Sequence, residues 1–306
     1  FPLTLLLFFA AGAGAGVYHP VGTGLVSNVY PPDKNGPAIG TLNFFGDVGK
    51  VLFPALAGLL VIRVGWKGSF AALGSIGVLV ALLFLIFFRR EIGHRRRDIA
   101  RNHANAEDTG VSFWRKGIKQ PGQFSLYAVI GFLDEAIRAT AVTFLGFLLI
   151  ENGIEKDAIG WFVSLAFFGG AFGKLLCGLP IRKLGPKVII LVTVVLKMIC
   201  CALLPSASPG WQMLLLIPLF GFVLNGTSSV LYIGIVPTFQ PQYRSRGYSI
   251  FYTINFIAAG SSPLLLGLVG DSYGLDAIYY SAAAVIVLAV PLALFLKGHE
   301  PVQEDS

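Results

Sequence analysis

Long apolar runs alternate with short polar connections along all 306 residues of this chain. A helix that crosses a bilayer needs about 20 mostly apolar residues, and each of these runs is long enough for one. Bounded by Pro, Gly and charged residues, the runs cover 2–30, 36–62, 68–88, 124–150, 157–181, 187–204, 209–239, 247–269 and 277–296. The pattern predicts an all-α membrane protein with about nine transmembrane helices.

Composition supports a membrane protein. Hydrophobic residues make up 55% of the chain and charged residues 13%, whereas a soluble domain carries about 25% charged residues. The net charge of +7 does not indicate nucleic acid binding, because the charges lie in the short connections between apolar runs. Cys177, Cys200 and Cys201 fall inside apolar runs without a C-x-x-C pair, which argues against a disulfide framework or zinc site. No cofactor or metal is predicted.

The basic residues are distributed unequally between the two sides of the membrane. Of the 23 Lys and Arg residues, 16 lie in connections on one side and three on the other, and nine of the 16 are in the connection 89–123. By the positive-inside rule the first side is cytoplasmic. We expect an integral protein of a bacterial inner membrane, with the long basic loop and the C-terminus inside the cell.

An internal repeat appears when the chain is shifted by 209 residues. The matched pairs include Pro54 with Pro263, Gly58 with Gly267 and Gly65 with Gly274. Parallel repeats are typical of transporters built from two similar halves. We therefore divide the chain into three helices of a first half (1–88), a cytoplasmic linker (89–123), a six-helix second half (124–298) and a tail (299–306). The three helices missing from the first half predict an N-terminal truncation and twelve helices in the intact protein.

The loop between two of the predicted helices carries a recognisable motif. Gly178, Arg182, Lys183 and Gly185 match positions of the G-x-x-x-D-R-x-G-R-R loop of the major facilitator superfamily, with Arg182 in place of the Asp. Together with the two halves and the basic linker, this loop makes the whole chain resemble that family. The resemblance implies a helical bundle of two six-helix halves that works as a secondary transporter.

A second motif lies on the helix predicted at 36–62. It resembles the antiporter signature G-x8-G-x3-G-P-x2-G-G of the same family, with Phe53 and Ala57 in place of two glycines. The matching positions are Gly40, Gly49, Pro54 and Gly58. The resemblance implies a helix that packs tightly, kinks at the Pro and serves proton-coupled export. The stretch 16–20 is also similar to the fosmidomycin-resistance branch of exporters.

Charged residues inside apolar helices are costly and therefore functional candidates. Asp134, Glu135 and Arg138 lie near the middle of the helix 124–150, where Arg138 can pair with either carboxylate along the helix. Such a pair would let the helix insert and accounts for one carboxylate. The second would favour its protonated form in an apolar environment, as a proton carrier must.

Two further positions are candidates for proton coupling. Asp47 and Lys50 are three residues apart, and they form either a neutral structural pair or a gate that exchanges partners as the halves rock. His19 precedes Pro20 and can titrate near neutral pH, although a structural role fits it equally. The coupling candidates are therefore Asp134, Glu135, Asp47 and His19.

Other polar side chains are candidates for the substrate cavity, and they are Arg138, Lys50, Asn225 and Tyr232. Lys197 lies on a helix that the family places at the periphery, so we expect it to snorkel or to find a partner on a neighbouring helix. Lys174 is closer to a helix end, where snorkelling is again expected.

The sequence therefore predicts a secondary active transporter that works by alternating access and exports a small organic compound, driven by protons. An importer of organic anions, with Arg138, Lys50 and His19 as counter-charges, is one alternative. A non-transporting membrane scaffold or sensor is another. No nucleophile–base arrangement indicates an enzyme. The expected partners are the lipid bilayer, a small-molecule substrate and protons, and no nucleic acid.

Overall fold

The computed structural model describes residues 2–14, 32–104, 117–240 and 243–297, and these residues are almost entirely helical, as predicted. The helices are Pro2–Gly14, α2 (Pro32–Ala104), α4 (Pro121–Glu151), α5 (Ile159–Gly178), α6 (Ile181–Leu203), α7 (Trp211–Gly234), α8 (Arg244–Tyr273), α9 (Leu275–Val287) and α10 (Ala289–Leu294). Two short 3₁₀ turns, η2 (Lys156–Ala158) and η3 (Val236–Thr238), precede α5 and follow α7.

Six stretches of the described residues are long and apolar enough to cross a membrane. They are Phe45–Phe87, Lys156–Gly178, Lys183–Leu203, Trp211–Thr238, Arg246–Tyr273 and Leu275–Leu294. The helix Pro2–Gly14 is too short to be among them, and charged residues interrupt the apolar sequence of α4. The count of nine transmembrane helices therefore stays a prediction.

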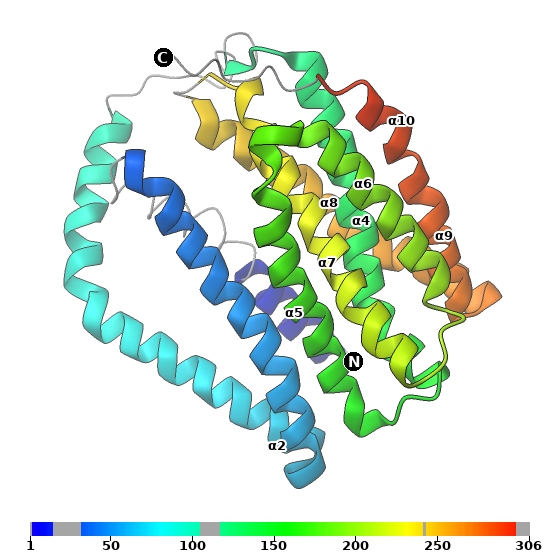
Figure 1. The fold of residues 1–306 in the computed structure, drawn as a ribbon. Helices are drawn as coiled ribbons and strands as arrows, with labels where there is room; N and C mark the ends of the chain where they lie inside the picture. The colour runs from blue at the N-terminus through cyan, green and yellow to red at the C-terminus, as the bar shows by residue number, and fades with distance from the viewer. Residues whose placement is uncertain (1, 15–31, 105–116, 241–242, 298–306) are drawn as a thin grey trace.

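The polar connection predicted after residue 62 is a sharp break inside α2. Gly65 has φ 71° and ψ 173°, which is far from helical. The break divides α2 into a first arm, residues 32–64, and a second arm, residues 66–104, which leave Gly65 in different directions, and the second arm bends again before its end (Figure 1). Gly274, the repeat partner of Gly65, has φ 91° and ψ 165° between α8 and α9. The backbone thus turns in the same way at both matched glycines.

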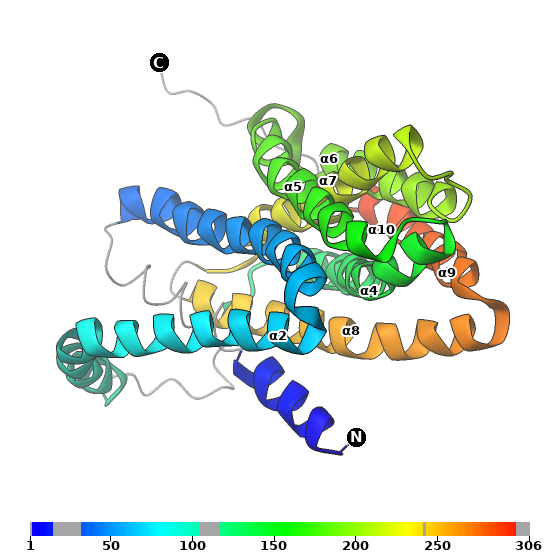
Figure 2. The same ribbon diagram turned by 90° about the horizontal axis from the view of Figure 1, so that it is seen from below.

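Helices α4 to α10 form one bundle around a common apolar core. Within it α5 packs on α7, α4 on α8 and α9, and α6 on α7 and α9. Fully buried side chains such as Ile130, Leu148, Phe220 and Tyr279 fill its centre. In the described residues α2 contacts this bundle mainly through α5 and η2, and its first arm runs beside α5 (Figures 1 and 2).

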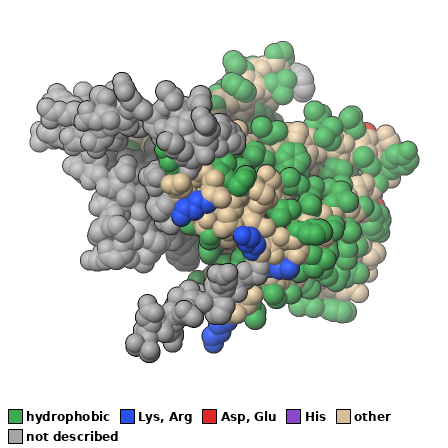
Figure 3. All heavy atoms as spheres, turned by 90° about the horizontal axis from the view of Figure 1, so that it is seen from above, with side chains coloured by type: hydrophobic (Ala, Val, Ile, Leu, Met, Phe, Trp, Pro, Cys, Tyr) green, Lys and Arg blue, Asp and Glu red, His purple; other side chains and the backbone are tan. Residues whose placement is uncertain are grey.

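The two ends of the bundle differ in charge. At the end that carries the C-terminus, the Lys187 Nζ donates to the carbonyl of Leu294 (2.5 Å) and the Lys119 N–H to that of Thr238 (2.8 Å). Figure 3 shows basic side chains on this end and hydrophobic ones around it. The described residues at the other end include the acidic Glu151, Glu155, Asp157, Asp271 and Asp276. We call the first end the basic end.

Candidate functional site

Two neighbouring helices hold the middle of α4 in place. The Ser262 hydroxyl of α8 donates to the carbonyl of Ala136 (2.8 Å), and the Tyr279 hydroxyl of α9 donates to that of Ala141 (2.9 Å). Both acceptors are α4 backbone groups next to the predicted charged cluster. The depth and rotation of that cluster are therefore set by side chains far away in the sequence.

Asp134 pairs with Lys197 of α6. The Lys197 Nζ donates to the Asp134 Oδ1, and the exposed fractions of the two residues are 0% and 1%. The carboxylate of α4 that Arg138 does not bond therefore has a cation of its own, which the sequence analysis did not predict. This cation, Lys197, lies 63 residues further along the chain. The residue pattern of one helix therefore could not predict the pair. Lys197 takes the second predicted option, a partner on another helix, and does not snorkel.

Glu135 pairs with Arg138 on α4 itself. The guanidinium donates twice, from Nε to Oε2 at 2.9 Å and from Nη2 to Oε1. The side chains of Glu135 and Arg138 are 7% and 29% exposed. This pair is therefore more accessible than the one between Asp134 and Lys197.

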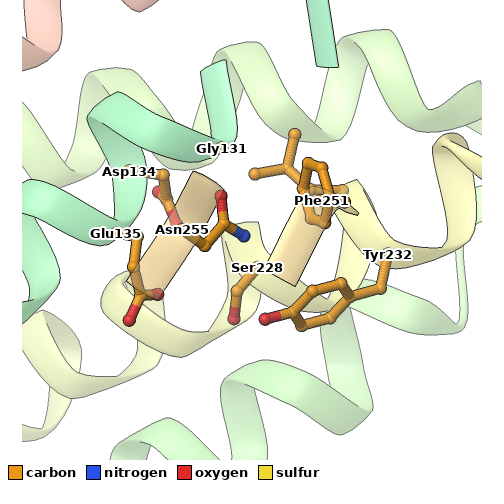
Figure 4. A pocket seen from close by; sticks show the side chains of 8 residues that line it. Gly131, Asp134, Glu135, Ser228, Tyr232, Phe251 and Asn255 are labelled. Carbon is orange, nitrogen blue, oxygen red and sulfur yellow. The ribbon is translucent and has the colours of Figure 1, made fainter. Parts of the chain in front are cut away.

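A narrow cleft adjoins these carboxylates (Figure 4), with about 150 Å³ of space between its lining atoms. Its lining is Gly131, Asp134, Glu135, Ser228, Leu231, Tyr232, Phe251 and Asn255. A β-carbon on Gly131 would lie 2.7 Å from the Phe251 ring and 3.0 Å from the Asn255 Oδ1. The absence of a side chain at Gly131 thus allows α8 to approach α4. The buried Asn255 Oδ1 has no hydrogen-bond partner among the described residues.

The structure separates the two predicted cavity residues of α7. Tyr232 lines the cleft and points its hydroxyl toward Ser228 (Figure 4). Asn225 lies elsewhere, at the seam between α5 and α7, where its Nδ2 donates to the carbonyl of Gly221 (3.4 Å) and faces Gly170. A role of Asn225 in the cleft is not supported by this position.

An aromatic ridge on α8 continues from the cleft and was missed by the sequence analysis. The ring of Tyr252 lies 5.1 Å from that of Tyr232, 6.3 Å from that of Tyr248 and 6.2 Å from that of Phe256. The α8 members recur every four residues, which places them on one helix face. This four-residue spacing of aromatic residues is visible in the sequence and would have predicted the ridge.

Asp47 of α2 binds two lysines. Lys174 of α5 donates to both of its carboxylate oxygens, at 2.8 and 2.7 Å, and Lys50 donates to Oδ1 at 3.2 Å. The expected pair with Lys50 is present, but Lys174 does not snorkel toward a helix end. It reaches across to α2, because the first arm of α2 packs on α5 at this height.

The antiporter-like motif also lies at the α2–α5 contact. A β-carbon on Gly160 of α5 would lie 2.5 Å from the Pro54 carbonyl oxygen and 3.1 Å from the Gly58 Cα. Two backbones thus touch here, which agrees with the expected tight packing. The expected kink at Pro54 stays a prediction, and the residue with non-helical φ and ψ inside α2 is Gly65. A β-carbon on Gly49 would meet only Phe53 of its own helix.

The motif between α5 and α6 forms a tight turn at the basic end. Gly178 ends α5, Lys183 is exposed, and Gly185 has φ 73° and ψ 160°. The surroundings of Gly40 and of the Arg182 side chain lie outside the described residues, as does His19. Among the described residues no group of three or more His, Cys, Asp or Glu side chains is placed to hold a metal ion.

Ion pairs buried in the middle of apolar helices are typical of polytopic membrane proteins that move ions or polar solutes. The sequence model of the Major Facilitator Superfamily matches residues 1–133 and 124–306. The chain belongs to this superfamily. It is a membrane transporter and not an enzyme.

Similar proteins carry different names. The chain is 20% identical over 320 residues to the "Probable L-galactonate transporter" of Escherichia coli (strain K12), covering 98% of this chain and 70% of that protein. It is 23% identical over 297 residues to the "Cis,cis-muconate transport protein" of Acinetobacter baylyi (95% and 71%). It is 24% identical over 302 residues to "Multidrug resistance protein MdtG" of Enterobacter lignolyticus (92% and 67%).

A solved structure shares the fold. It is a bacterial homolog of the human lysosomal transporter Spinster in an inward-facing and occupied conformation, with a TM-score of 0.61 and 16% identity. The match covers 90% of this chain and 72% of that one.

Proposed function

We propose that this transporter is a secondary active exporter of a small organic compound, driven by protons and working by alternating access. The observation that carries the proposal is the pair of Glu135 and Arg138 beside the cleft, a carboxylate with a bidentate partner that is 29% exposed. A proton on Glu135 removes the charge that holds Arg138, so protonation and the position of the guanidinium are linked.

Asp47 supports alternating access. It binds one lysine on its own helix and another across the α2–α5 contact. When α2 and α5 separate, Lys50 stays within reach and keeps the carboxylate neutralised, which lowers the cost of breaking the bond to Lys174. Asp47 would thus act as a gate that changes partners, with Lys174 as the partner that closes it.

The topology is part of the proposal. Nine transmembrane helices belong to two halves, with the boundary in the linker 89–123. The charge difference between the two ends of the bundle supports a cytoplasmic basic end by the positive-inside rule. The linker and the C-terminus are then inside the cell, and the membrane is the inner membrane of a bacterium.

Export is favoured over import by the tight contact of Pro54 and Gly58 with Gly160, which fits the antiporter-like motif. The second candidate is import of an organic anion. It is favoured by Arg138, which bonds the cleft-lining Glu135, and by two relatives named for L-galactonate and cis,cis-muconate, which are carboxylates.

Growth assays test the proposal. The protein is expressed from its complete reading frame in an efflux-deficient bacterial host and exposed to a panel of toxic compounds. We expect resistance to at least one compound, loss of that resistance in Glu135→Gln, and no loss in Glu151→Gln, a matched control on the exposed end of α4.

Two results would contradict this reading. Resistance that survives Glu135→Gln would remove Glu135 from coupling and leave Asp47 and His19 as candidates. No resistance at all, together with uptake of labelled L-galactonate or cis,cis-muconate that depends on Arg138, would establish the second candidate instead.

A further inference from the structure

Lys197 is the most deeply buried charged side chain in the described part of the chain, at 0% exposure. It lies on α6, which packs on α7, α9 and α10, while its backbone stays away from that of α4. The side chain spans this gap and ends on Asp134. Lys197 thus bonds one carboxylate, that of Asp134, and does not itself line the cleft.

The four charges at the centre of the bundle divide into two neutral pairs. Lys197 bonds Asp134, and Arg138 donates twice to Glu135 without bonding Asp134. The titratable groups that face them from the packed elements are Tyr232 of α7, Tyr252 of α8, Cys201 of α6 and, through Arg138, Lys174 of α5. Tyrosine and thiol are neutral near neutral pH, so they do not substitute for the ammonium of Lys197.

The two pairs differ in the free-energy cost of protonating their carboxylate. A proton on Asp134 would leave the Lys197 ammonium charged inside an apolar core, because no other carboxylate in the described residues bonds it. A proton on Glu135 would release Arg138, whose side chain is 29% exposed and therefore not enclosed by apolar groups alone. Proton uptake at Glu135 is therefore much less costly.

We propose that Lys197 is a positioning residue that keeps Asp134 ionised and fixed, and that Glu135 is consequently the carboxyl group that takes up and releases the coupling proton. The part on Glu135 rests on the proposed function, whereas the part on Asp134 does not. Lys197 acts through Asp134 and does not touch the substrate.

Carbodiimide labelling reads the protonation of each carboxyl group directly. Dicyclohexylcarbodiimide reacts with protonated carboxyl groups in apolar surroundings, and peptide mass spectrometry identifies the modified residue. The purified complete protein would be labelled over a series of pH values as wild type, Lys197→Met, Lys197→Arg and Lys156→Met, an exposed lysine at the opposite end that serves as a matched control.

We expect the wild type and Lys156→Met to be labelled at Glu135, increasingly at lower pH, and not at Asp134. Lys197→Met should add strong labelling at Asp134, and Lys197→Arg should restore the wild-type pattern. Labelling of Asp134 in the wild type, or its absence in a folded Lys197→Met, would overturn the role of Lys197.

A double variant covers the case in which Lys197→Met does not fold. Asp134→Asn with Lys197→Met removes both charges, so no unpaired charge stays buried. We expect it to fold and to keep the pH dependence of transport, because Glu135 remains. A folded double variant that loses this pH dependence would refute the assignment of the proton to Glu135. Wild-type transport without any pH dependence would instead refute the proposed function and leave the labelling result at Asp134 standing.

Discussion

Asp47 of α2 and Lys174 of α5 lie 127 residues apart in the sequence and bond through both carboxylate oxygens, at 2.8 and 2.7 Å. The same carboxylate accepts a third hydrogen bond from Lys50, one turn along its own helix. Asp47 therefore pairs with one lysine on its own helix and with another lysine on a different helix. The α2–α5 contact is held by a charge that can lose one partner without becoming unpaired.

The two lysines are expected to act non-additively on stability. Lys50→Met should cost less than about 1 kcal/mol, because Lys50 is 42% exposed. Lys174→Met should cost about 1–3 kcal/mol. The double substitution leaves Asp47 unpaired and should cost about 3–5 kcal/mol. Thermal unfolding of the purified complete protein in detergent measures all three, with Lys183→Met as an exposed control. Simple additivity would mean that the lysines do not share Asp47.

The contact of α2 with α5 should be sensitive to one methyl group. A β-carbon on Gly160 would lie 2.5 Å from a backbone oxygen, which cannot move without moving α2. Gly160→Ala is therefore expected to destabilise the protein by about 1–3 kcal/mol through overpacking. Gly74→Ala, where a β-carbon meets open space, should be neutral or slightly stabilising. Equal unfolding temperatures for both variants would show that α2 does not pack on α5 in this way.

The break in α2 should depend on a glycine. Gly65 and Gly274 combine φ of 71° and 91° with ψ of 173° and 165°, a backbone region essentially limited to glycine that costs another residue about 1–3 kcal/mol. Gly65→Ala and Gly274→Ala are expected to lower the free energy of unfolding by similar amounts. Gly77→Ala, inside the second arm of α2 and without close neighbours, is the control. If Gly65→Ala behaves like Gly77→Ala, the two arms of α2 form one continuous helix.

Glu135→Gln should abolish uphill transport and leave substrate exchange intact. The neutral amide cannot release a proton, so we expect net transport against a gradient to be lost while exchange of labelled for unlabelled substrate continues. The measurement uses proteoliposomes of the complete protein with the substrate found in the growth assay and an imposed pH gradient. Loss of both activities would assign Glu135 to substrate binding, and retention of both would exclude it from coupling.

The sequence by itself determined the all-helical membrane architecture, because the bilayer requires long apolar helices and these appear as long apolar runs. It also indicated the position of the break in α2, since a glycine in a polar connection marks a turn. It placed Arg138 within reach of both Asp134 and Glu135, because residues three and four apart on a helix are neighbours whatever surrounds them. The choice of Arg138 between two carboxylates stayed open at that level.

Only the tertiary structure decided which charges are neutralised by other helices. Asp134 with Lys197 and Asp47 with Lys174 are pairs separated by 63 and 127 residues. Nothing in the periodicity of one helix states which neighbour it packs on or at what height. That choice depends on the close approach of backbones, such as Gly160 against Pro54 and Gly58, and small residues permit many such approaches. Packing of the whole bundle selects one of them, and with it the partner of each buried charge.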